Sequence, residues 1–66
     1  MFNNRQLDNI RGLRVGGEIV YHISQQLDAD GISQVKVQLG TLPLVLDVQF
    51  IGNEKVGYFV KIIRIR

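Results

Sequence analysis

The sequence contains no cysteine and no tryptophan, and it has one proline and one histidine among its 66 residues. Without cysteine the chain has no disulfide framework, no thiolate zinc site and no cysteine nucleophile. No apolar run approaches the ~20 residues that span a bilayer, and the first residues lack the pattern of a signal peptide. We therefore expect a cytoplasmic protein that does not insert into a membrane.

Length and composition indicate a small globular protein. A chain of this size buries only about 60% of the surface of its unfolded form, so residues 1–66 are predicted to form a single small domain. Apolar residues make up 45% and charged residues 21%, which is close to globular averages and excludes a disordered chain. The formal net charge of +2 is a weak indication of nucleic-acid binding.

The pattern predicts a mostly β fold, with a short N-terminal helix followed by about four antiparallel strands. Helical spacing occurs in residues 3–13, where Leu7 and Ile10 share a face and Gly12 ends the helix. The adjacent glycines at 16–17 permit the tight connection that a helix needs before a strand. The sheet is expected to be either barrel-like or an intertwined dimer.

Two alternating segments predict the first hairpin. From residue 18 the side chains of Ile19, Tyr21 and Ile23 share one face, opposite polar neighbours. Asp30-Gly31 is a strong turn dipeptide, because both residues tolerate left-handed conformations. The alternation of residues 35–39 then predicts the returning strand.

The last two predicted strands are the most apolar. Residues 42–50 place Leu42, Leu44, Leu46, Val48 and Phe50 on one face. Pro43 puts the beginning of this strand at an edge or a bulge, since proline has no ladder donor. After a turn at residues 52–55, the strand 56–66 is apolar on both faces, which indicates burial on both sides.

A two-sided apolar strand implies a second covering layer, which a single small sheet with one helix does not supply. Either the sheet closes into a barrel or a second copy packs against it, and small domains commonly enlarge their core by oligomerisation. We favour a homo-oligomer whose interface contains Tyr58, Val60, Ile62, Ile63 and Ile65. These residues are expected to face the apolar side of strand 42–50.

The sequence shows no catalytic, cofactor-binding or metal-binding constellation. His22 and Ser24 share a strand face, but no third group orients the imidazole. Asp28 and Asp30 resemble the start of a calcium loop, yet Val37 stands where that loop needs a bidentate glutamate. We therefore predict a non-enzymatic protein that acts through protein partners.

The alternative to an assembly protein is a small β-barrel that binds nucleic acid. Its contacts would come from basic residues near the two ends of the chain, which are Arg5, Arg11, Arg14, Lys61, Arg64 and Arg66. Such binding would weaken steeply with salt, because phosphate neutralisation releases counterions.

The order of elements resembles the SpoA (surface presentation of antigens) domains, which end flagellar motor-switch proteins and their type III secretion counterparts. The residues on which this resemblance rests are Leu13 at the helix end, the glycines at 16–17, and Ile19 at the beginning of the following strand. The apolar residues of 48–51, followed by 53–62, are similar to the closing hairpin of those domains. The resemblance implies an intertwined β-rich dimer that serves as a non-catalytic assembly module.

A second resemblance is to the PilZ domains, which bind cyclic di-GMP. It lies in the strands 35–39 and 42–50 and in the ending 56–60. Arg11 and Arg14 are spaced differently from the family's ligand-binding arginines. This resemblance gives cyclic di-GMP binding as a further alternative.

Overall fold

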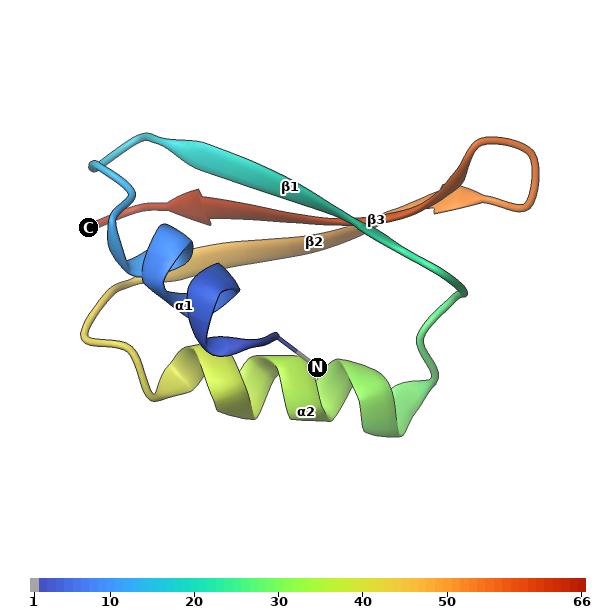
Figure 1. Ribbon diagram of the computed structural model, residues 1–66, viewed down its shortest axis with the longest axis horizontal. Coiled ribbons are helices and arrows are strands. Elements are labelled where there is room, and N and C mark those ends of the chain that lie inside the picture. The colour runs from blue at the N-terminus through green and yellow to red at the C-terminus, as the bar shows by residue number, and fades with distance from the viewer. Residues whose placement is uncertain (1) are drawn as a thin grey trace.

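A three-stranded antiparallel sheet carries two helices on one of its faces (Figure 1). The computed structural model describes residues 2–66. Its elements are α1 (Asn4–Arg11), β1 (Glu18–Ile23), α2 (Ala29–Gly40), β2 (Leu46–Asn53) and β3 (Gly57–Arg64). The strand order is β1-β3-β2, so the last strand of the chain is the centre of the sheet. The fold is therefore mixed α/β, and the prediction of a mostly β chain with about four strands is wrong.

The predicted N-terminal helix is confirmed as α1. Asn3 caps it, because its side-chain oxygen accepts a hydrogen bond from the Gln6 backbone N–H at 2.8 Å. The Gln6 side chain in turn accepts from the Asn3 backbone N–H at 2.9 Å, which completes a capping box. Gly12 is the C-cap, as the sequence predicts.

The predicted strand at residues 35–39 is wrong, since these residues lie in α2. The Asp28 side chain accepts from the Gly31 backbone N–H at 2.8 Å and so caps a helix where a hairpin turn was expected. Val35 and Leu39 stand four residues apart and are both buried, whereas Val37 between them is 71% exposed. The same apolar residues fit either period, and the N-cap favours the helix.

The C-terminal hairpin is confirmed with shifted bounds. The strand predicted at 42–50 begins only at Leu46 and continues to Asn53. Leu42 is buried nonetheless, in the connection that follows α2. The Asn53 side chain accepts from the backbone N–H groups of Lys55 and Val56, which closes the turn into β3.

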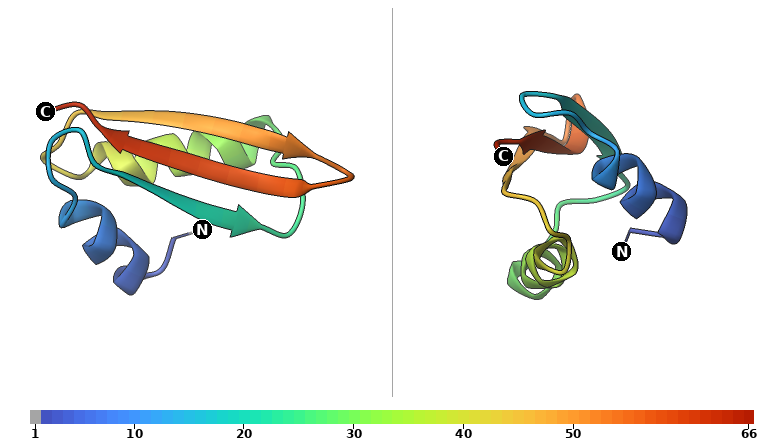
Figure 2. Two further views of the ribbon diagram at one scale, coloured as in Figure 1. Left: turned by 90° about the horizontal axis from the view of Figure 1, so that it is seen from above. Right: turned by 90° about the vertical axis from the view of Figure 1, so that its left-hand side faces the viewer.

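The core lies between the sheet and the two helices, which cover the same face (Figure 2). Its buried side chains come from the N-terminal segment, both helices, the connection after α2 and the central strand, and they are Phe2, Ile10, Val35, Leu39, Leu42, Val60 and Ile62. In Figure 2, α1 lies on the side of β1 and α2 runs beneath the sheet near β2. The sheet in residues 2–66 is open, with β1 and β2 at its edges, so the predicted closed barrel is wrong.

Candidate functional site

The face of the sheet opposite the helices, called here the helix-free face, combines apolar and charged side chains. Strand register arranges them in rows that cross the strands. The acidic row consists of Glu18, Ile63 and Asp47, and the lysine row consists of Val20, Lys61 and Gln49. The aromatic row consists of His22, Phe59 and Ile51, and the terminal pair consists of Val45 and Ile65. Along the sheet the order is terminal pair, acidic row, lysine row and aromatic row.

Several apolar side chains of this face are open to solvent. Four of them are 45–51% exposed, and these are Val20, Val45, Ile51 and Ile65. Phe59 and Ile63 on the central strand are half-buried, because the neighbouring strands shield their sides. Clustered apolar side chains of this kind on one surface are typical of an interaction site.

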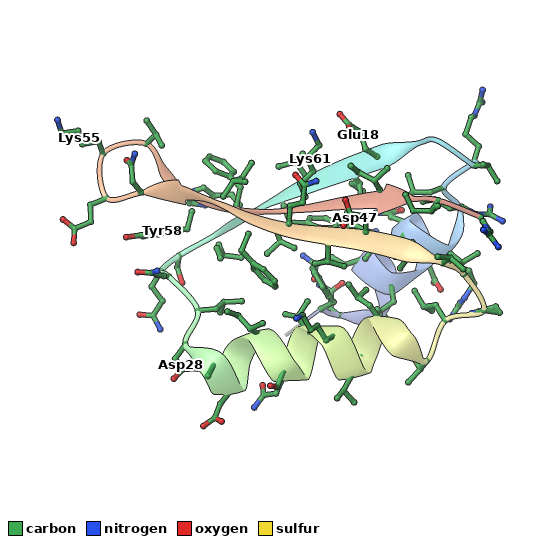
Figure 3. All side chains as sticks on the ribbon, turned by 180° about the vertical axis from the view of Figure 1, so that it is seen from behind. Glu18, Asp28, Asp47, Lys55, Tyr58 and Lys61 are labelled. Carbon is green, nitrogen blue, oxygen red and sulfur yellow. The ribbon has the colours of Figure 1, made fainter. Side chains whose placement is uncertain are left out.

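Charge on the helix-free face alternates between rows. The two carboxylates of the acidic row flank Ile63, and Lys61 stands one row further along the central strand. The Lys61 ammonium lies 3.4 Å from the Glu18 carboxylate, and both side chains project away from α2 (Figure 3). The pair is partly exposed, so it contributes little to stability and remains available for other partners.

The structure divides the predicted interface residues between the two faces. Tyr58, Val60 and Ile62 lie on the face that the helices cover, and Val60 and Ile62 are fully buried within one chain. Ile63 and Ile65 lie on the helix-free face. One chain therefore covers the first side of the apolar strand with its own helices, and only the second side is open to a partner.

The six basic residues predicted for nucleic acid are only partly brought together. The connection that contains Arg14 contacts the end of β3, since Gly16 N–H donates to the Arg64 carbonyl at 2.8 Å. The Arg64 guanidinium donates to the Leu13 carbonyl at 2.6 Å and to that of Arg66 at 3.1 Å. These contacts tie Arg64 to the fold at the end of the sheet where the chain terminates.

Two further basic residues are engaged with carboxylates. Arg11 lies 2.8 Å from Asp8 on α1, and Lys61 pairs with Glu18 on the helix-free face. Within residues 2–66, Arg5, Arg14 and Arg66 form no ion pair, and all three are exposed. Arg11, which the PilZ resemblance would use together with Arg14, thus pairs with a neighbour on its own helix, and both side chains of that pair are exposed.

The polar residues considered for chemistry have structural partners. The His22 ring packs edge-on against Phe59, with centroids 5.2 Å apart. Asp28 caps α2. No group of three histidine, cysteine, aspartate or glutamate side chains suited to a metal ion occurs in residues 2–66.

A groove between α2 and β2 is the feature that sequence reasoning missed. It has a volume of about 540 Å³ and includes Lys36, Leu39, Leu44, Leu46 and Val48 in its lining. Because residues 35–39 were predicted as a strand, no helix was expected beside β2. The signal that indicates this helix is Asp28 followed by Val35 and Leu39 at helical spacing.

Comparison of the chain with protein-family models, curated proteins and solved structures finds no match. In the described residues, neither helix has both the length and the apolarity to cross a bilayer. Functional proposals for this chain therefore rest on its own residues and their geometry.

Proposed function

We propose that this protein is a non-catalytic protein–protein assembly module that forms a homodimer through the helix-free face of its sheet. The observation that supports the proposal is the order of rows on that face, which is complementary to itself. An apolar pair, an acidic row, a lysine row and an aromatic row follow one another along the strands.

The two copies of the proposed dimer are related by a two-fold axis that lies between their sheets. The axis is perpendicular to the strands and passes midway between the acidic and lysine rows. Such a rotation sets the acidic row of one copy over the lysine row of the other. It also sets the aromatic row over the terminal pair of the second copy. Each Lys61 then lies above Ile63 of the second copy, between Glu18 and Asp47 of that copy, so both charge and apolar surface are matched.

Packing of two sheets face to face follows a known geometry. Aligned sheets stack about 10 Å apart with their strands inclined by about 30°. On the central strand, the half-buried Phe59 is then set over Ile65 of the second copy, and the half-buried Ile63 is set over Lys61 of that copy. This second layer covers the apolar side of β3 that the helices leave open.

The size of the face sets the expected behaviour in solution. It consists of three strands of six to eight residues, which places the interface near the lower limit of about 1,200 Å² for specific complexes. We therefore expect a dimer that dissociates on dilution. Exchange of whole strands between copies, which the SpoA resemblance implies, would instead give a dimer that dissociates slowly.

Sedimentation velocity from micromolar to millimolar protein tests the proposal. The wild-type mass should rise from 7.5 kDa towards twice that value, whereas Ile63→Lys should remain monomeric. Ile63 is half-buried, so this variant should keep its circular dichroism spectrum, while its new ammonium group faces Lys61 of the second copy and repels it. The matched control Val37→Lys changes a 71% exposed residue of α2 and should dimerise normally.

The proposal has clear opposing outcomes. A wild-type chain that stays monomeric at millimolar concentration would contradict it. A folded Ile63→Lys variant that dimerises like the wild type would show that another surface mediates association.

Nucleic-acid binding is the second candidate, and the contact between the Arg14 connection and the end of β3 favours it. This contact gathers Arg14 and Arg66 at one end of the molecule, and neither belongs to an ion pair in residues 2–66. Fluorescence anisotropy with a labelled single-stranded oligonucleotide should then show binding at low salt that falls steeply as salt rises. Arg14→Glu with Arg66→Glu should abolish it, and salt-independent or undetectable binding would exclude this function.

A further inference from the structure

Besides the helix-free face, the free edge of β2 has the features of a binding site. The groove of about 540 Å³ runs between this strand and the C-terminal half of α2. Its apolar wall includes Leu39, Leu44, Leu46 and Val48. Leu39 is buried, and the other three are only half-buried. The groove therefore offers apolar side chains directly beside the edge of the sheet.

The backbone of β2 supplies unpaired hydrogen-bonding groups along the same groove. Val45 and Ile65 are hydrogen-bonded to each other, because Ile65 N–H donates to the Val45 carbonyl at 2.8 Å. In an antiparallel ladder the bonded residues alternate, so Asp47 and Gln49 also direct their backbone groups towards β3. The N–H and C=O groups of Leu46 and Val48 consequently point away from the sheet, and no strand pairs with them in residues 2–66.

The charges beside this edge differ between its two sides. Lys36 on α2 lines the groove, and it forms no ion pair within residues 2–66. Asp47 also belongs to the lining of the groove, but strand alternation puts its side chain, like that of Gln49, on the helix-free side of β2. A strand added at the edge would thus meet a cation and apolar side chains on one side, and a carboxylate on the other.

We propose that β2 binds an extended segment of a partner protein by strand addition. The segment adds a fourth strand to the sheet, with apolar side chains and one carboxylate on its groove side and neutral or basic side chains on its other side. The carboxylate pairs with Lys36, and the apolar side chains contact Leu44 and Leu46. Main-chain hydrogen bonds to Leu46 and Val48 provide affinity, and the side-chain contacts provide specificity.

The other edge of the sheet lacks this combination. Beside β1 lies α1 (Figure 2). The Gln6 carbonyl of α1 accepts a hydrogen bond from the Tyr21 hydroxyl at 3.3 Å, and Tyr21 also packs on Phe2. The groove described above is lined by residues of α2, of β2 and of the connection between them, and by none of α1 or β1. Strand addition is therefore assigned to the edge of β2 alone.

A short synthetic peptide tests this site on the full chain. The probe has seven residues, with threonine at the odd positions and valine, glutamate and valine at the even positions. In a titration followed by ¹H–¹⁵N NMR, the amides of Leu46 and Val48 should shift and saturate. A peptide with lysine in place of its glutamate should bind at least tenfold more weakly to the wild-type chain.

Two controls separate strand addition from nonspecific apolar contact. Alternate backbone nitrogens of the peptide can be methylated at its odd or at its even positions. The register that removes the donors towards β2 should weaken binding at least tenfold. Lys36→Glu should reverse the preference between the glutamate and lysine peptides, while Lys55→Glu, a charge reversal in the β2–β3 turn, should leave it unchanged. Equal binding of both methylation registers and the parent peptide, or no saturable shift at millimolar peptide, would overturn the proposal. Shifts confined to the helix-free face would do the same.

Discussion

Gln38 holds the backbone of Phe2 with two hydrogen bonds. Its side-chain oxygen accepts from the Phe2 N–H at 3.0 Å, and its amide donates to the Phe2 carbonyl at 2.8 Å. The two residues are 36 positions apart in the sequence. Because Phe2 is buried and packs on the ring of Tyr21, this contact connects the segment before α1 to α2 and to the sheet at once.

Replacement of Gln38 by alanine should lower the free energy of unfolding by about 1–2 kcal/mol, since each part-buried hydrogen bond contributes roughly 1 kcal/mol. Urea denaturation followed by circular dichroism measures the effect. Gln34→Ala is the matched control, because Gln34 is exposed on the same helix and its side chain makes no hydrogen bond in residues 2–66. Equal losses in the two variants would show that the contact with Phe2 does not stabilise the fold.

A pair of aspartate substitutions distinguishes a helix from a strand at residues 35–39. Val35 is fully buried, whereas Val37 is 71% exposed. Val35→Asp buries an unpaired charge at a cost of several kcal/mol, which is comparable with the whole stability of a domain this small. We expect Val35→Asp to unfold and Val37→Asp to melt within a few degrees of the wild type. In a strand both residues would share a face, and both variants would behave alike.

The sequence predicts the elements that depend on local signals. Asn3 and Gly12 define α1 through capping, and the alternation from Glu18 defines β1. Alternation alone predicts that the last strand is apolar on both faces, and the structure places Ile62 on the face that the helices cover and Ile63 on the other. These features need only the periods of helix and strand, together with the preferences of capping residues.

The missed features depend on contacts between distant residues. Val35 and Leu39 fit both a strand and a helix; the Asp28 N-cap favours the helix, and burial of both side chains in one core with Val60 and Ile62 of β3 completes the choice. The position of β3 between β1 and β2 is likewise set by pairing across the chain. Without α2 and this strand order, the sequence does not show that the sheet face carrying Ile63 and Ile65 is left uncovered. It also does not show the groove beside β2.

Two glycines should respond in opposite directions to alanine. Gly52 has a φ of +112°, and a Cβ there would lie 2.0 Å from the Gly57 carbonyl oxygen, so Gly52→Ala should destabilise the chain by more than about 2 kcal/mol. Gly40 ends α2 with open space around it, so Gly40→Ala should be neutral or stabilising by up to about 1 kcal/mol. Thermal and urea denaturation of both variants measure the difference. A well-tolerated Gly52→Ala would contradict the close approach of the two strands in this hairpin.

Exchange of charges tests the register of the proposed dimer. Lys61→Glu makes the lysine row acidic, so the rotation described above would set carboxylates against the acidic row of the second copy. The double variant Glu18→Lys with Asp47→Lys makes both rows basic. Each variant alone should dimerise at least tenfold more weakly than the wild type, because like charges then face each other across the interface.

A mixture of these two variants should restore association. In the mixed dimer the acidic rows of one chain face the basic rows of the other, so opposite charges meet at both contacts of the two-fold arrangement. Sedimentation velocity at low salt should show a heterodimer in the equimolar mixture and monomers in each separate sample, while Lys55→Glu should dimerise like the wild type. If the mixture remains monomeric although both variants are folded, the acidic and lysine rows do not face each other. If Lys61→Glu alone still dimerises at full strength, the lysine row does not face the acidic row of the second copy, and the proposed register is wrong.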